Sequence, residues 1–133
     1  QNGLEKVNTD LVGVHDGVRP FVSLRVIENV FTTAEKSGAA IPVVSLKDSI
    51  RKVNGSESIA VERANYQLVQ TPHCFKTSLI KAAYAKGYQA SFTYDASVVE
   101  AASHPIHLVE GNDENIKITT TNDLKMADWL LNQ

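Results

Sequence analysis

The sequence predicts an α/β fold, with helices on both faces of a mostly parallel sheet. Residues 11–15 form a short apolar run that stops at Asp16-Gly17, and its lack of polar alternation is typical of a strand buried on both faces. A second apolar run occupies residues 39–44, and helical spacing lies between the two runs. Two strands separated by a helix are most simply arranged as a right-handed βαβ unit.

The helix between these strands has a recognisable start and end. Ser23 can cap its N-terminus, and Gly38 can adopt the left-handed conformation that ends many helices. Its apolar side chains recur at helical spacing, at Leu24, Ile27, Val30, Phe31 and Ala34. The pattern predicts one amphipathic helix.

A protruding β-hairpin is predicted within residues 45–70. Asn54-Gly55 is a strong turn signal, and strand-like residues flank it on both sides. The segment is too polar and charged to be packed on both faces, so one face is exposed to water or covered by another subunit. This is consistent with a dimerisation arm inserted into the domain.

Three further helices are predicted in the second half of the chain. The first spans residues 77–86, and the second is a short helix capped by Asp95. The last begins with a capping-box pattern formed by Thr120 and Asp123. Its apolar residues share one face and are Leu124, Ala127, Leu130 and Leu131. Short apolar runs also predict strands at residues 90–93, 106–109 and 116–118.

Composition limits the possible functions. The chain has 133 residues, 43% of them hydrophobic, which suits one domain or part of one. A formal net charge of -2 argues against nucleic acid or an anionic membrane as a partner. The single cysteine, Cys74, excludes an internal disulfide and suits a reducing compartment. No apolar run approaches the roughly 20 residues that span a bilayer, so we expect a cytoplasmic protein.

Polar residues follow several of the predicted strands. Ligands of open α/β sheets bind beyond the carboxyl ends of the strands, so these residues are candidates for an anion site. They are His15, Asp16, Arg19, Asp48, Thr93 and Asp95, and Lys117 lies within the last predicted strand. An alternative remains open, in which Asp16 and Arg19 only form an ion pair that stabilises a turn.

Several other kinds of site are not supported. The seven glycines form neither a dinucleotide fingerprint nor a P-loop. His104 and His107 are separated by Pro105 and lack a third ligand, which argues against a metal site. No nucleophile elbow or Cys-His signature occurs, so covalent catalysis is not expected.

Residues 14–21 (VHDGVRPF) resemble the HDAARPF motif of 2-C-methyl-D-erythritol 4-phosphate cytidylyltransferases. Further strings resemble motifs of that family in the same order, at residues 38–43 (GAAIPV), 47–49 (KDS), 69–72 (VQTP), 95–100 (DASVVE) and 115–119 (NIKIT). The resemblance covers essentially the whole chain. It corresponds to the C-terminal part of a family member, without the N-terminal part that carries the glycine-rich loop for CTP.

The resemblance implies a Rossmann-like nucleotidyltransferase of the non-mevalonate isoprenoid pathway. Such an enzyme joins the phosphate of methylerythritol phosphate to the α-phosphate of CTP with Mg²⁺ and releases pyrophosphate. Catalysis of this kind depends on positioning and on neutralising charge. The resemblance also implies a homodimer formed through the hairpin arm. Because the CTP cradle is missing, we expect no turnover from this chain alone.

Individual roles follow from the matched motifs. Asp16 and Arg19 would bind methylerythritol phosphate, Asp16 would also bind the metal ion, and Lys117 would neutralise charge at the reacting phosphates. Asp16 and Lys117 are thus the expected catalytic residues. Ser49 and Arg63 would reach from the arm into the partner's substrate pocket, where Arg63 suits bidentate phosphate binding.

Thr71 and Thr93 match family threonines near the substrate, although local turn bonding would also explain them. Three positions depart from the family pattern: Tyr94 replaces an acidic residue, Ser49 a threonine and His73 a glutamine. Two other functions remain open, a ribitol-5-phosphate cytidylyltransferase and a dimerisation module without chemistry. The DASVVE and GAAIPV strings favour methylerythritol phosphate over ribitol phosphate.

Overall fold

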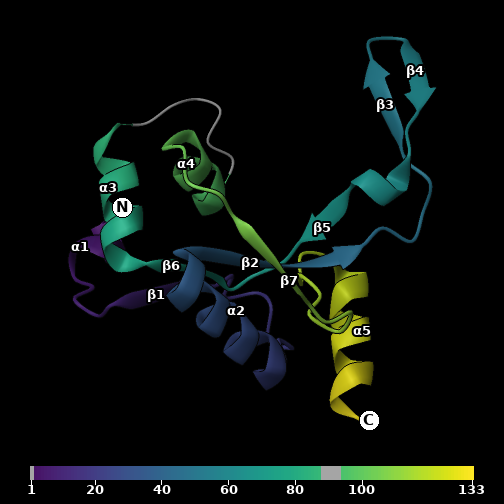
Figure 1. Ribbon diagram of the computed structural model, residues 1–133. Coiled ribbons are helices and arrows are strands. Elements are labelled where there is room, and N and C mark those ends of the chain that lie inside the picture. Colours follow the sequence, from purple (N-terminus) through teal and green to yellow (C-terminus); the bar gives the residue numbers. More distant parts are fainter. Residues whose placement is uncertain (1, 88–93) are drawn as a thin grey trace.

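A central five-stranded sheet organises the molecule (Figure 1). The structure is a computed structural model that describes residues 2–87 and 94–133. The strands of the sheet are β1 (Leu11–Val14), β2 (Ala39–Ser45), β5 (Gln67–Val69), β6 (His73–Lys76) and β7 (His107–Glu110). Strand β2 lies at its centre, with β5 and β6 along one edge and β7 along the other.

The prediction of a mostly parallel sheet was wrong for the described strands. Among them, only β2 and β7 pair in parallel, while the β1–β6, β2–β6 and β2–β5 pairs are antiparallel. Strand β6 was not predicted, because its four residues are polar at both ends and lead directly into a helix. Strand β6 lies between β1 and β2 and is antiparallel to both. Strands β1 and β2 therefore run in the same direction, but they do not pair with each other as in the predicted βαβ unit.

Helices cover both faces of the sheet, as predicted. Helix α2 (Leu24–Ser37) packs on one face, and α3 (Thr77–Ala85) and α4 (Asp95–Ala101) pack on the other (Figure 1). Strand β2 serves both layers, because Ile41 belongs to the core under α3 and α4 while Ala40 belongs to the core under α2. The α/β class is thereby confirmed.

The predicted ends of α2 are also confirmed. The Ser23 hydroxyl accepts a hydrogen bond from the backbone N–H of Val26 at 3.2 Å. Gly38 has a φ of 95°, and its N–H donates to the carbonyl of Ala34 at 2.8 Å.

The segment after β7 differs from its prediction. Residues 116–118 form no strand and instead belong to a loop that runs along the loop after β1, where the N–H of Ile118 donates to the carbonyl of Val18 at 2.9 Å. The strand predicted at 90–93 lies outside the described residues. The short helix α4 begins at Asp95 with Tyr94, and not Asp95, in the capping position.

The last helix, α5 (Thr121–Leu131), begins with the predicted capping box. Thr120 Oγ1 accepts from the N–H of Asp123 at 3.2 Å, and Asp123 Oδ2 accepts from the N–H of Thr120 at 2.7 Å. Its apolar side chains are largely exposed, whereas Ala127 is buried. A four-residue helix, α1 (Asn2–Glu5), precedes β1.

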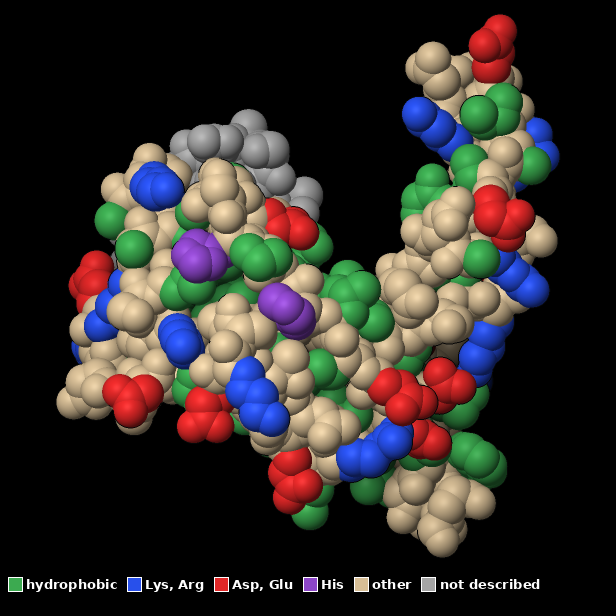
Figure 2. Space-filling view, viewed as in Figure 1, with side chains coloured by type: hydrophobic (Ala, Val, Ile, Leu, Met, Phe, Trp, Pro, Cys, Tyr) green, Lys and Arg blue, Asp and Glu red, His purple; other side chains and the backbone are tan. Residues whose placement is uncertain are grey.

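The hairpin arm stands clear of the body (Figures 1 and 2). Within the described structure, strands β3 (Arg51–Asn54) and β4 (Glu57–Ala60) pair only with each other, and all of their residues are exposed. Gly55 in the turn has a φ of 59°, which glycine adopts without strain. A 3₁₀ turn, η1 (Arg63–Asn65), then leads back into β5. Among the described helices, none is both long and apolar enough to cross a membrane.

Candidate functional site

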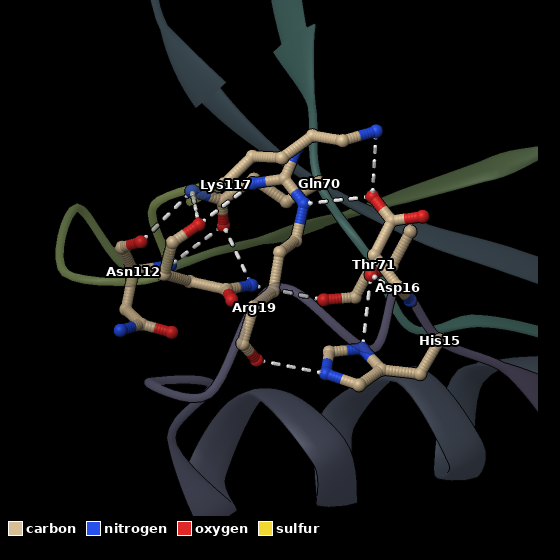
Figure 3. A network of polar contacts seen from close by, with 8 residues as sticks. His15, Asp16, Arg19, Gln70, Thr71, Asn112 and Lys117 are labelled. Carbon is tan, nitrogen blue, oxygen red and sulfur yellow. Dashed lines mark hydrogen bonds and ion pairs between the residues drawn. The ribbon is translucent and has the colours of Figure 1, made fainter. Parts of the chain in front are cut away.

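Three of the predicted residues converge at one edge of the sheet. Asp16 and Arg19 lie in the loop after β1, and Lys117 lies in the loop after β7. Asp16 Oδ2 is 3.2 Å from Arg19 Nε and 3.3 Å from Lys117 Nζ (Figure 3). One carboxylate oxygen therefore bridges two cations that come from distant parts of the chain.

The loop after β1 is held by a chain of hydrogen bonds around His15. The N–H of Asp16 donates to Thr71 Oγ1 at 3.0 Å, and Thr71 Oγ1 lies 2.9 Å from His15 Nδ1. His15 Nε2 lies 2.9 Å from the carbonyl of Arg19 (Figure 3). Because a carbonyl only accepts, Nε2 carries the proton and Nδ1 accepts from the threonine hydroxyl. The Thr71 hydroxyl thus holds the loop after β1 through partners 55 and 56 positions earlier in the chain, which is not the local turn bonding of the alternative interpretation.

The cations and the carboxylate open onto a cleft of about 290 Å³. Its lining residues are Val14, Asp16, Arg19, Val69, Thr71, His73, Tyr94, Asp95 and Lys117. One carboxylate oxygen of Asp95 is already used, because the Tyr84 hydroxyl donates a hydrogen bond of 2.6 Å to Oδ1. The cleft therefore presents both cations together with a short row of hydrogen-bonding groups.

A larger cavity of about 640 Å³ lies beside the ends of β2 and β7. Its cations are already paired, Arg25 with Glu110 at 3.4 Å and Lys47 with Asp113 at 2.8 Å. These ion pairs are well exposed, and Glu114 adds a third carboxylate to the two cations of this lining, so this cavity is the poorer candidate for an anion site.

The two cations grouped at Asp16 suit an anionic ligand, although Asp95 at the other side of the lining brings the formal charge of the whole cleft to zero. Burial alone would raise the pKa of Asp16, but hydrogen bonds and charge from Lys117 and Arg19 outweigh burial and hold the pKa below its usual range. The carboxylate is therefore ionised at neutral pH, and the trio carries one net positive charge. Arg19 is largely buried, whereas the Lys117 side chain is 49% exposed and able to turn toward a ligand.

Uncharged amides that the sequence analysis did not single out support this site. Arg19 Nη1 donates to the carbonyl of Asn115 at 2.7 Å, and Asn115 Nδ2 donates to the carbonyl of Thr71 at 2.9 Å. Asn115 is completely buried. Its side-chain amide donates to the Gln70 side chain, which in turn donates to the backbone carbonyl of Asn112. Gln70 and Asn115 fall inside the VQTP and NIKIT strings, which was the only signal available for them.

The remaining predicted residues do not join the cleft of this chain. Ser49 and Arg63 are exposed residues of the arm, and Arg63 Nη1 donates to the backbone carbonyl of Lys47. Neither lines the cleft. Thr93 lies outside the described residues.

The donor set at Asp16 is compatible with Mg²⁺ bound in company with phosphates. No group of three or more potential metal ligands occurs in residues 2–87 and 94–133. However, both ion pairs of Asp16 use Oδ2, which leaves Oδ1 for another contact. Proteins often bind Mg²⁺ through one or two carboxylates plus substrate phosphates.

Comparisons with known proteins agree with this geometry. The model of the family IspD: 2-C-methyl-D-erythritol 4-phosphate cytidylyltransferase matches residues 1–133. The 2-C-methyl-D-erythritol 4-phosphate cytidylyltransferase of Bacteroides thetaiotaomicron is 52% identical over 132 residues, which cover 98% of this chain and 60% of the relative. That of Porphyromonas gingivalis is 43% identical over 133 residues, with the same coverage.

Solved structures give the same result. A crystal structure of 2-C-methyl-D-erythritol 4-phosphate cytidylyltransferase from Thermus thermophilus has a TM-score of 0.88 and 40% identity, covering 98% of this chain and 66% of that chain. A 4-diphosphocytidyl-2C-methyl-D-erythritol synthase from Anaerococcus prevotii has a TM-score of 0.90 and 29% identity, covering 99% and 62%. These neighbours confirm the predicted Rossmann-like fold. The chain spans about 60% of the length of the curated relatives it matches. It belongs to the 2-C-methyl-D-erythritol 4-phosphate cytidylyltransferase family.

Proposed function

We propose that the whole protein transfers a cytidylyl group from CTP to 2-C-methyl-D-erythritol 4-phosphate and releases pyrophosphate. The relatives carry this activity in their names. The observation that carries the proposal is the convergence of Asp16, Arg19 and Lys117 on one cleft. Because the chain spans about 60% of its relatives' length, we assign it the alcohol-phosphate half of the site. The reaction would serve isoprenoid biosynthesis.

The chemistry requires no covalent intermediate on the protein. An oxygen of the methylerythritol phosphate attacks the α-phosphorus of CTP, and the bond from that phosphorus to the pyrophosphate oxygen breaks, so pyrophosphate leaves with the electron pair. Negative charge shifts toward the leaving oxygen and the oxygens around the α-phosphorus. Two polyanions must therefore be held in line while cations neutralise this charge.

The two cations of the cleft suit different parts of this task. The Arg19 guanidinium donates to the carbonyl of Asn115 and is largely buried, so its side chain has little conformational freedom. This suits a residue that fixes the substrate phosphate. Lys117 is half-exposed and paired with Asp16, which suits a cation that moves onto the reacting phosphates. Asp16 would bind a substrate hydroxyl.

Asp16 is also the residue that would hold Mg²⁺, through Oδ1. The ion would neutralise charge on the triphosphate. The neighbouring Lys117 and Arg19 keep the Asp16 carboxylate ionised and hence able to bind a cation.

The arm supplies the second part of the proposal, a homodimer in which Ser49 and Arg63 complete the partner's cleft. An isolated two-stranded hairpin is marginal in water, yet the arm exposes apolar Val53 and Ile59. A second subunit covering these residues would explain both features.

Pyrophosphate release by the purified whole protein tests the assignment. Activity with CTP and 2-C-methyl-D-erythritol 4-phosphate, and little with ribitol 5-phosphate, is expected. A preference for ribitol 5-phosphate would transfer the assignment to the ribitol enzyme. The 133-residue chain alone should show no turnover, and measurable CTP consumption by it would contradict the half-site assignment.

A further inference from the structure

The buried side chain of Gln70 joins two loops of the site through both ends of its amide. Gln70 lies between β5 and β6 and is 5% exposed. Its Nε2 donates to the carbonyl of Asn112 at 2.9 Å, and its Oε1 accepts from the N–H of Asn112 at 3.3 Å (Figure 3). Oε1 also accepts from Asn115 Nδ2 at 3.4 Å. An amide used on both sides fixes position and orientation together.

Gly111 provides the space for this arrangement. A Cβ at position 111 would lie 2.4 Å from Gln70 Oε1 and 3.2 Å from the carbonyl oxygen of Val43. The first distance is too short for any real contact, so the absence of a side chain at 111 allows the Gln70 amide to lie against the loop. We call Gln70, Gly111, Asn112 and Asn115 the Gln70 clasp.

The clasp reaches the cations through two of its members. Asn112 Oδ1 accepts from the N–H of Ser23 at 3.1 Å, and Asn112 Nδ2 donates to the carbonyl of Phe21 at 3.0 Å, which fixes the chain just after Arg19. Asn115 binds Arg19 through its carbonyl and stands two residues before Lys117. The clasp residues carry no charge, so their contribution to the site is positional.

We propose that the Gln70 clasp is the positioning device of the phosphate site, holding Arg19 and the Lys117 loop in place so that both cations face one anion. The identity of the anion as an alcohol phosphate rests on the proposed function, whereas the positioning itself does not. The competing explanation is that the clasp only stabilises the fold. It predicts lower thermal stability without a specific effect on anion binding.

Inorganic phosphate binding to the whole protein, measured by calorimetry, separates the two explanations. Gln70→Ala removes the amide, and Gly111→Ala displaces it without deleting any hydrogen-bonding group. Each should weaken phosphate binding about tenfold, at the lower end of what supporting residues contribute around metal ligands. The double variant should bind about as weakly as either single variant, because both changes disrupt the same contact. If Gln70→Ala does not fold, Gly111→Ala carries the test.

Ile80→Val is the matched control, because Ile80 is fully buried in the core under α3, away from the cleft. It should lower the melting temperature and leave phosphate binding unchanged. In a Lys117→Ala background, the added effect of Gln70→Ala on binding should shrink to less than about threefold, because the clasp acts through that lysine and Arg19.

Kinetics give a second readout. The clasp variants should raise KM for methylerythritol phosphate more than KM for CTP. Clasp variants with normal phosphate affinity and a lowered melting temperature would overturn the proposal. If they bind phosphate weakly while the wild-type protein fails to bind methylerythritol phosphate, the clasp stands and the proposed function falls.

Discussion

The cleft and the hairpin arm are built in opposite ways. Around Asp16, side chains from the loops after β1, β5 and β7 bond to one another, and three of them, Gln70, Thr71 and Asn115, are buried. In the arm as the structure describes it, β3 and β4 bond only to each other, and every residue of both strands is exposed. The cleft is therefore preorganised by its own chain, whereas the described part of the arm has no such support, which is why we propose a role for it at a partner's surface.

The largest effect should come from removing Lys117, the more exposed of the two cations in the cleft. Lys117→Ala in the whole protein should lower kcat/KM by a factor on the order of 100 or more, because charge on the reacting phosphates would lose its neutralising partner. Pyrophosphate release is the measurement. Lys36→Ala, on the exposed side of α2, is the matched control and should change nothing. Comparable losses in both variants would remove Lys117 from the site.

Arg63 tests whether the arm completes a partner's cleft. Arg63→Ala should lower kcat/KM for methylerythritol phosphate about tenfold, as expected for the loss of one charged contact. Mixing it with Lys117→Ala should restore about a quarter of wild-type activity, because half of the dimers then carry one intact site of two. No recovery in a mixture shown to exchange subunits would place Arg63 in its own chain's site or in none.

The exposed apolar residues of the arm test the dimer itself. Ile59→Lys should weaken association by about tenfold or more, because the substitution places a charge on a surface proposed to be covered. Sedimentation velocity over a range of concentrations measures this. Leu131→Lys, at the end of α5, serves as the control, because Leu131 is at least as exposed as Ile59. A wild-type protein that sediments as a monomer throughout would refute both the dimer and the role of Arg63.

The smallest expected effect is a pH dependence of stability arising from His73. This ring is 4% exposed, and neither nitrogen makes a side-chain hydrogen bond in the described structure. Burial lowers its pKa, against a smaller opposing influence of Asp95. The unfolded chain is therefore protonated first, and acid favours unfolding as pH falls below about 6.5.

His73→Gln, which introduces the residue usual in the family, should remove this component of the stability curve between about pH 7 and 5. Chemical denaturation at several pH values measures the free energy of unfolding. Stability curves of the same slope in both proteins would show that His73 does not contribute. Titration of Asp16 lies in a more acidic range, since its pKa is lowered, and so does not interfere.

The parts of the fold that were predicted correctly have local signals. The Ser23 cap, the Gly38 stop, the turn at Asn54-Gly55 and the capping box at Thr120 each depend on residues a few positions apart. Strand β6 lacks such a signal, because its partners on both sides come from elsewhere in the chain. Its insertion accounts for two of the three antiparallel pairs, and the third is the pairing of β5 with β2.

The site shows the same division. Asp16 and Arg19 were found because charged side chains after a strand are conspicuous, and Lys117 because it falls in the NIKIT string. The structure brings the three side chains together. The amides of Gln70, Asn112 and Asn115 were missed, because an uncharged side chain gives no sign in the sequence of the partners it will meet across the fold.

The close approach of Gln70 to Gly111 also limits how these two positions can diverge among relatives. A Cβ at 111 collides with the amide at 70 as it lies in the structure, so a residue larger than glycine requires the Gln70 side chain to move out of its place or to become smaller. Lineages should therefore keep both residues or exchange both, and intermediates with only position 111 altered should be rare.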